Sequence, residues 1–126
     1  MSKPYIPYMH TGPWPIMIGF SNSEKQFKRE MKRLRVPKHD MPRFISEGAG
    51  ATTHTLTHPK EGTVVIICIG KRKKRHTKTQ WIALIAHECV HAWQEVCVAS
   101  RDTRPSDEAA AYGVQWIMTA AMDALR

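Results

Sequence analysis

The segment Thr79–Ala99 constrains the fold of this chain more than any other. It contains no Gly or Pro, and its apolar residues recur with the period of an α-helix. These apolar positions are Ile82, Ile85, Ala86, Cys89, Trp93, Val96 and Cys97. We therefore expect a long helix with a buried stripe, and polar residues beside that stripe should lie next to the domain core.

Two histidines and a glutamate lie beside this stripe, in the run HECVH. His87 and His91 are four positions apart, so on a helix they share one face. At this spacing two imidazoles can hold one metal ion, and Glu88, the next residue round the helix, can reach a water molecule on that ion. The pattern predicts a hydrolase with zinc as its cofactor and Glu88 as its general base.

A catalytic zinc usually takes three protein ligands and leaves one position for water, so the histidines need a companion. We expect Glu108, because it opens the next predicted helix, which a short connection can fold back against the first. The small residues 109–111 would allow the two helices to approach closely. Five further residues stay open as the third ligand: Asp107, Asp102, His54, His58 and His76.

The remaining segments predict an α+β fold, with a small mixed sheet of about four strands. The sheet should pack on a first helix, the HECVH helix and a C-terminal helix that begins near Ser106. The first helix carries its apolar residues at Phe27, Met31 and Leu34. Strands are expected at Ile16–Phe20, Arg43–Ser46, Ala51–His58 and Thr63–Ile69.

The last two of these strands differ in composition, and the difference predicts their places in the sheet. Residues 63–69 form an unbroken apolar run, which is typical of a buried central strand. Residues 51–58 are rich in Thr and alternate in polarity, which suits a strand at the sheet edge. An edge strand beside a metal site can pair with an extended peptide through its free backbone groups.

Length and composition indicate one domain covering residues 1–126, with a Pro-rich arm at residues 1–15. No segment approaches the roughly twenty apolar residues of a membrane span, and the first residues do not resemble a secretory signal, so we expect no membrane contact and a cytoplasmic location. The odd cysteine count and the apolar surroundings of Cys68, Cys89 and Cys97 predict buried, reduced thiols.

The chain is basic, with a formal charge of +8, and much of this charge lies in one loop. The loop residues are Lys71, Arg72, Lys73, Lys74 and Arg75. They can contact an acidic partner or nucleic acid, or they can form a solvated connection between a strand and a helix. The alternative function is therefore a nucleic-acid-associated or interaction protein with a structural or vestigial zinc site. An interaction protein of this kind would lack catalysis because the Pro-rich N-terminal arm occupies the substrate cleft.

The run HECVH followed by an E-A-A-A-Y helix resembles the gluzincin branch of zinc metallopeptidases, and in particular the small single-domain zincins of bacteria and phages. The resemblance implies a zincin-like fold and peptide bond hydrolysis. It also implies that His87, His91 and Glu108 are zinc ligands and that Glu88 is the general base.

The chain departs from this family where larger gluzincins place an acidic residue, four positions after the ligand Glu. Tyr112 stands there, on the same helix face as Glu108. It can orient a ligand or donate its phenol to an oxyanion, or it can be a buried aromatic residue. His54 and His58, on the expected edge strand, are further candidates for such donors.

Overall fold

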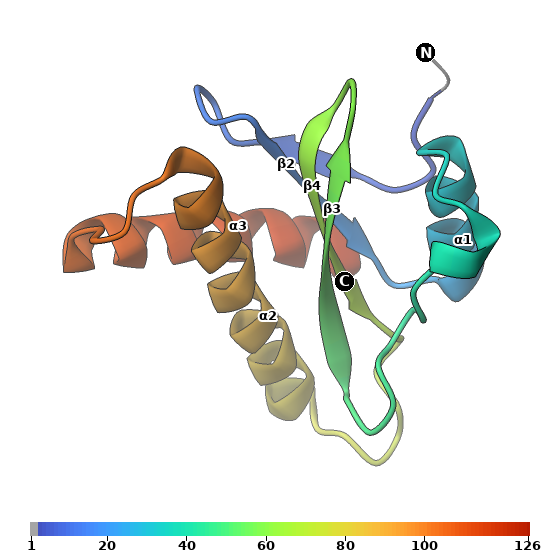
Figure 1. The fold of residues 1–126 in the computed structure, drawn as a ribbon. Helices are drawn as coiled ribbons and strands as arrows, with labels where there is room; N and C mark the ends of the chain where they lie inside the picture. Colours follow the sequence, from blue (N-terminus) through green and yellow to red (C-terminus); the bar gives the residue numbers. More distant parts are fainter. Residues whose placement is uncertain (1–2) are drawn as a thin grey trace.

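The computed structural model describes residues 3–126 and shows a four-stranded mixed sheet between helices (Figure 1). The strand order is β1-β2-β4-β3, with β2 and β4 parallel and the outer pairs antiparallel. The elements are β1 (Tyr8–His10), β2 (Ile16–Ser21), α1 (Glu24–Arg33), a 3-10 turn (Lys38–Asp40), β3 (Ala51–His58), β4 (Gly62–Ile69), α2 (Lys78–Ser100) and α3 (Asp107–Leu125). The predicted α+β class, the four-stranded mixed sheet and the three helices are confirmed for this part of the chain.

Each face of the sheet carries its own core. On one face α1 buries Phe27, Met31 and Leu34, as predicted, against the β4 residues that point that way. On the other face α2 and α3 pack together and cover the opposite side of β2 and β4. This three-layer arrangement leaves β3 at the sheet edge next to α2, and that is where the HECVH run lies.

The two strands of the β3–β4 hairpin take the predicted places. Residues 64–69 of β4 are buried, since β2 and β3 flank the strand and helices cover both faces. β3 pairs with β4 alone, so one edge of its backbone faces outward. Side chains alternate along β3, with Ala51 packing on the α2 side and Leu56 on the α1 side.

The predicted strand at Arg43–Ser46 is wrong, because this segment runs as irregular chain. Its backbone bonds to side chains of β3 and not to a neighbouring strand: the Ser46 amide donates to Thr52 Oγ1 at 2.8 Å, and Phe44 O lies 3.0 Å from His54 Nε2. The fourth strand is instead β1, in the described part of the Pro-rich arm. Residues 1–2 of that arm lie outside the described residues.

Capping residues set the first residues of α2 and α3. Thr77 caps α2 reciprocally with Gln80, as the Thr77 hydroxyl accepts the Gln80 amide at 3.0 Å and the Gln80 side chain accepts the Thr77 amide at 2.8 Å. Ser106 caps α3 by accepting the Ala109 amide, as predicted. Within residues 3–126, the structure contains no helix with the length and apolar character needed to cross a membrane.

Candidate metal centre

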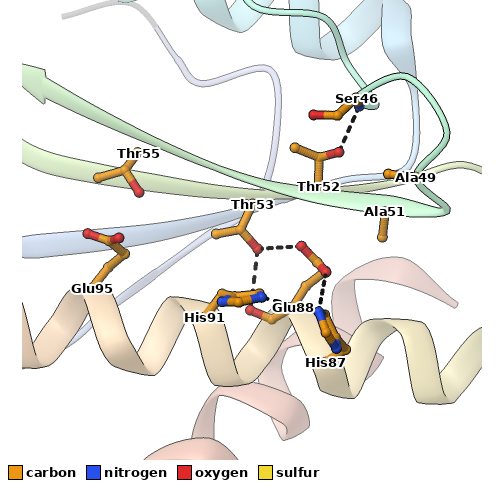
Figure 2. Close-up of a pocket in the computed structure, with 10 residues that line it drawn as sticks. All are labelled: Ser46, Ala49, Ala51, Thr52, Thr53, Thr55, His87, Glu88, His91 and Glu95. Atoms are coloured by element: carbon orange, nitrogen blue, oxygen red, sulfur yellow. Dashed lines mark hydrogen bonds and ion pairs between the residues drawn. The ribbon is translucent and has the colours of Figure 1, made fainter.

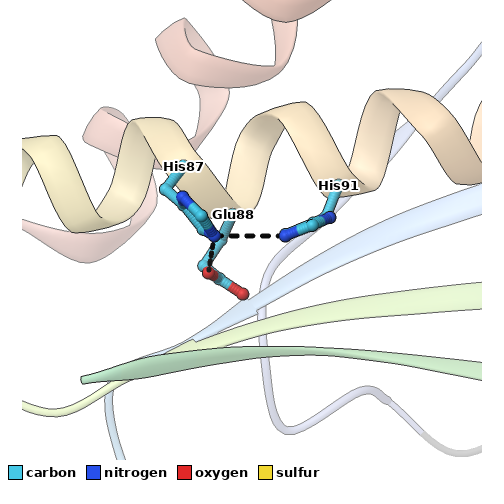
Figure 3. A group of neighbouring side chains, drawn as sticks. All are labelled: His87, Glu88 and His91. Carbon is cyan, nitrogen blue, oxygen red and sulfur yellow. Dashed lines mark hydrogen bonds and ion pairs between the residues drawn. The ribbon is translucent and has the colours of Figure 1, made fainter. Parts of the chain in front are cut away.

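His87 and His91 turn their rings toward one point on the face of α2 that looks to β3 (Figure 3). Their Nε2 atoms lie 3.1 Å apart. Two nitrogen ligands of a tetrahedral zinc, each about 2.0–2.1 Å from the ion, stand about 3.3 Å from one another. The pair therefore fits a shared metal ion with little movement, and the predicted convergence of the two histidines is confirmed.

Glu88 lies between the histidine pair and the edge strand, and only 7% of its surface is exposed. Thr53 of β3 donates its hydroxyl to Glu88 Oε1 at 2.9 Å (Figure 2). The other carboxylate oxygen, Oε2, lies 3.8 Å from His87 Nε2. One oxygen is thus held by the sheet while the second faces the histidines. The candidate ligand atoms of His87, Glu88 and His91 all lie within 4.8 Å of one another.

A second polar contact orients His91. Its Nδ1 lies 3.0 Å from Gln94 Oε1, one turn further along α2. Because an amide oxygen only accepts hydrogen bonds, Nδ1 carries the hydrogen in this contact, and Nε2 can offer its lone pair to a metal. Sequence analysis missed both Gln94 and Thr53. Gln94 could have been predicted, because residues three positions apart on a helix are neighbours. The contact of Thr53 could not, because it depends on which face of β3 meets α2.

The three side chains border an open hollow of about 380 Å³ between β3 and α2. Its walls are Thr53 and Thr55 of the edge strand on one side and the histidines and Glu95 of α2 on the other (Figure 2). The His87 side chain is 67% exposed, so the pair is open to solvent. A molecule from solution can therefore reach the histidines and the edge strand together.

The structure does not bring Glu108 to the histidines. α3 packs along α2 with Gly113 against Trp93, and the Met118 sulfur lies 3.8 Å from the Cys89 sulfur. Glu108 precedes Gly113 in α3, so it lies nearer the C-terminal end of α2 than the histidines do. In addition, α3 runs on the side of α2 that faces away from β3 (Figures 2 and 3). Among residues 3–126, only His87, Glu88 and His91 form a group that can hold a metal ion.

The other candidates also lie apart from this group. Tyr112 is 66% exposed and does not line the hollow. The alternative expectation for this residue, a buried aromatic side chain, is therefore wrong. Asp102 is exposed in the loop between α2 and α3, and Asp107 is exposed at the start of α3. His76 lines a neighbouring hollow.

The two histidines of the edge strand face the opposite layer, because they alternate with the threonines that meet α2. The His54 ring stacks at 5.0 Å on Phe27 of α1. His58 accepts the backbone amides of Lys60 and Glu61 through Nδ1. Neither side chain points to the site, and each has a structural partner where it lies.

The three cysteines are free thiols, as predicted. Cys68 and Cys89 are buried, and Cys97 is half-buried. Burial raises the pKa of the Cys89 thiol to about 12, with a smaller contribution from the nearby Glu88 carboxylate. Burial likewise raises the pKa of the Cys68 thiol. Thiols in this state are poor nucleophiles and poor metal ligands, so the site chemistry belongs to the histidines and the carboxylate.

The chain was also compared with protein-family models, curated proteins and solved structures, and none of them matches it. A functional assignment must therefore come from the geometry of the site. Three features carry it: the paired imidazoles, the buried carboxylate beside them, and the edge strand that borders the same hollow.

Proposed function

We propose that this protein is a zinc-dependent peptidase of zincin type, in which His87 and His91 hold the metal ion and Glu88 is the general base. One observation carries the proposal: two imidazole nitrogens 3.1 Å apart lie beside a buried carboxylate in a hollow that an edge strand borders. Each part has a use in peptide hydrolysis: the imidazoles bind zinc, the carboxylate carries a proton, and the edge strand can pair with a peptide.

The donor set suits zinc, which binds imidazole nitrogen and carboxylate oxygen. A bound zinc ion supplies carbonyl polarisation and acidifies water. The resemblance to gluzincins makes Glu108 the expected third ligand, but its position in this conformation gives that role no support. Metal content of the Glu108→Gln variant tests it directly, because loss of a zinc ligand weakens binding whereas an exposed glutamate elsewhere does not affect it.

Glu88 has the position that a proton carrier needs. Thr53 fixes Oε1, and Oε2 remains on the side of the histidines. In the proposed reaction the carboxylate accepts a proton from the attacking water and returns it to the departing amine. Tyr112 takes no part in this scheme because it lies away from the hollow.

The substrate backbone has a natural partner in β3. Its outer edge pairs with no strand in residues 3–126, so its free amides and carbonyls can bond to an extended peptide. A peptide added there would pass over Thr53 and Thr55 and along the histidine pair. This arrangement would bring a backbone carbonyl to the metal and to Glu88 at once.

The Glu88→Gln variant tests the proposal. Glutamine keeps the shape but cannot accept the proton, so we expect the variant to bind about one zinc per chain and to hydrolyse a protein substrate about 10²- to 10⁴-fold more slowly. Elemental analysis and a casein cleavage assay measure the two effects.

The matched control is Glu24→Gln, an exposed glutamate of α1 that does not line the hollow, which should keep both metal and activity. Full activity of the Glu88→Gln variant would refute the proposed mechanism. Loss of zinc from it would make Glu88 a ligand and leave the reaction without its base.

A further inference from the structure

The hollow at the histidines is one of three that adjoin along α2. A second hollow, of about 550 Å³, shares Ala49, Ala51, His87 and Glu88 with the first. A third, of about 140 Å³, shares Ala49, Gly50, His76 and Leu84 with the second. Together they form a groove that leads from Glu95, past the histidines, to the loop that precedes α2.

The two ends of this groove carry opposite charges. Lys71, Lys73 and Arg75 line the third hollow, and all three are exposed. None of them forms an ion pair with a carboxylate in the part of the chain that the structure describes. Glu95 lines the first hollow at the other end. The loop cations are therefore available to a ligand, and the carboxylate at the far end would repel an acidic one.

We propose that Lys71, Lys73 and Arg75 form a subsite that selects peptide segments with acidic side chains on that side of the scissile bond. The inference rests on the proposed function, since it treats the groove as the place where a peptide binds. It goes beyond that function because it states which peptides are preferred and which residues decide the preference.

The shape of the groove favours a single peptide chain over nucleic acid. The third hollow is small, and Trp81 and Leu84 line it together with the loop cations. A carboxylate side chain can enter such a space and keep its stem against apolar walls. A duplex binds instead through many phosphates along an extended surface, and no aromatic residue lies within the Lys71–Arg75 run to stack on a single strand.

Helix geometry gives the distance between the proposed subsite and the scissile bond. His76 and His87 are separated by eleven positions, mostly within α2, which corresponds to about 16 Å along a helix. An extended peptide advances about 3.3 Å per residue, so the subsite lies roughly five residues from the scissile bond. Acidic residues should therefore be enriched at about that distance, on one side only.

Binding of labelled peptides to the metal-free protein tests the inference without any need for turnover. The probes are a neutral Ser- and Gln-rich peptide and the same peptide with a cluster of glutamates at one end. Fluorescence anisotropy at low salt should show about tenfold tighter binding of the glutamate peptide, because three exposed ion pairs each contribute a few-fold. This preference should largely disappear at high salt.

The decisive variant combines Lys71→Gln, Lys73→Gln and Arg75→Gln. Arg72 stays, because its guanidinium donates to His76 O at 3.1 Å and helps to hold the loop. We expect the preference for the glutamate peptide to fall below about twofold while binding of the neutral peptide is unchanged. An unchanged thermal unfolding curve shows that the variant is folded.

The matched control removes the same charge from α1, with Lys25→Gln, Lys28→Gln and Lys32→Gln. These residues are exposed on the other side of the sheet, so the preference should survive. Equal loss in both variants would attribute the effect to net charge and overturn the inference. So would a single-stranded oligonucleotide that binds more tightly than the glutamate peptide and loses this affinity in the loop variant.

Cleavage assays separate this inference from the proposed function. With zinc present, the loop variant should still hydrolyse the neutral peptide at the wild-type rate but lose the faster cleavage of the glutamate peptide. If the wild type hydrolyses neither peptide, the proposed function fails, and the anisotropy result still decides whether the loop selects acidic segments.

Discussion

At the scale of single residues, the contact between Thr53 and Glu88 joins the edge strand to the proposed base. The Thr53 hydroxyl is the hydrogen-bond donor to Glu88 Oε1, and the carboxylate is buried. A buried carboxylate oxygen without a partner costs about 1–3 kcal/mol, so Glu88 would turn elsewhere if the hydroxyl were removed. In the proposed mechanism Thr53 would therefore position the base and would not itself touch the substrate.

The Thr53→Val substitution keeps the shape of the side chain and removes the donor. We expect kcat for peptide hydrolysis to fall about tenfold to a hundredfold, because a displacement of the general base by about 1 Å slows the reaction by about this factor. Bound zinc and KM should change little. Steady-state kinetics and elemental analysis measure these effects.

The Thr53→Ser variant should restore most of the rate. Thr57→Val is the control, since Thr57 lies on the same face of β3 but outside the hollow. A role in strand stability alone would be indicated if valine lowered the unfolding temperature and kcat in parallel at both positions.

At the scale of elements, a buried carboxylate fastens α1 to the N-terminal arm. Arg33 donates to both oxygens of Glu30 at 2.7 Å, and the Tyr8 hydroxyl and the Tyr5 amide donate to the same group. Burial by itself would raise the pKa of Glu30, but these donors outweigh it and hold the pKa below its ordinary value. These contacts hold Tyr5 and Tyr8 against α1, whereas Trp14 at the end of the arm packs on Trp93 of α2. None of residues 3–15 lines the hollow at the candidate metal centre.

The depressed pKa of Glu30 predicts how stability changes with pH. The folded protein holds the ionised form more strongly than the unfolded chain does, so this stabilisation is complete above the ordinary pKa and is lost as the pH falls through about 4 and below. Glu30→Gln should lower the free energy of unfolding by about 3 kcal/mol at neutral pH, because it leaves Arg33 without its charged partner.

Urea unfolding across the acid range measures both effects. Between pH 3 and 5 the free energy of unfolding should depend less on pH in the Glu30→Gln variant than in the wild type. Glu24→Gln on the exposed side of α1 is the control and should change stability by less than about 0.5 kcal/mol. An equal pH dependence in wild type and Glu30→Gln would show that other carboxylates cause the acid sensitivity.

The packing of α3 on α2 depends on Gly113. A Cβ at this position would lie 2.3 Å from the Trp93 ring, which also meets the Trp14 ring edge-on. Gly113→Ala should therefore destabilise the protein by about 1–3 kcal/mol, although alanine is intrinsically better in a helix by about 1 kcal/mol. Chemical denaturation measures the change.

The exposed position Ala111 provides the comparison for the Gly113 substitution. Ala111→Gly should cost only the intrinsic helix propensity, about 1 kcal/mol. A Gly113→Ala variant more stable than the wild type would mean that α2 and α3 are farther apart than described.

At the scale of the whole molecule, the candidate metal centre joins α2 to the edge of the sheet. The ligands come from the middle of α2 and the carboxylate is bonded to β3, so a metal ion bound there favours the folded chain. Zinc at 100 times its dissociation constant should add about 2.7 kcal/mol to the free energy of unfolding. This stabilisation corresponds to a rise of roughly 10 °C in Tm.

Differential scanning calorimetry with and without zinc, and after removal of the metal by a chelator, measures this shift. The His87→Ala variant should show none of it. A shift of equal size in His87→Ala would place the zinc elsewhere on the chain and remove the main support for a metal centre on α2.

The sequence by itself determined the features that depend on neighbours along the chain. The helical period and the absence of Gly and Pro predicted α2, and the spacing of four between His87 and His91 predicted that their rings would meet. The unbroken apolar run predicted β4 as a buried strand, and alternation predicted β3 as the edge. These properties follow from repeats of 3.6 and 2 residues, which can be read from the chain directly.

Only the tertiary structure decided which elements meet the histidines. The pleat of β3 turns Thr53 to α2 and His54 to α1, and a shift of one residue would have exchanged them. The contact of Gly113 with Trp93 leaves Glu108 away from the site, although its place in the sequence suggested a ligand. These contacts depend on how side chains from distant segments fill the space between the layers. The periodicity of apolar residues along the chain does not determine that packing.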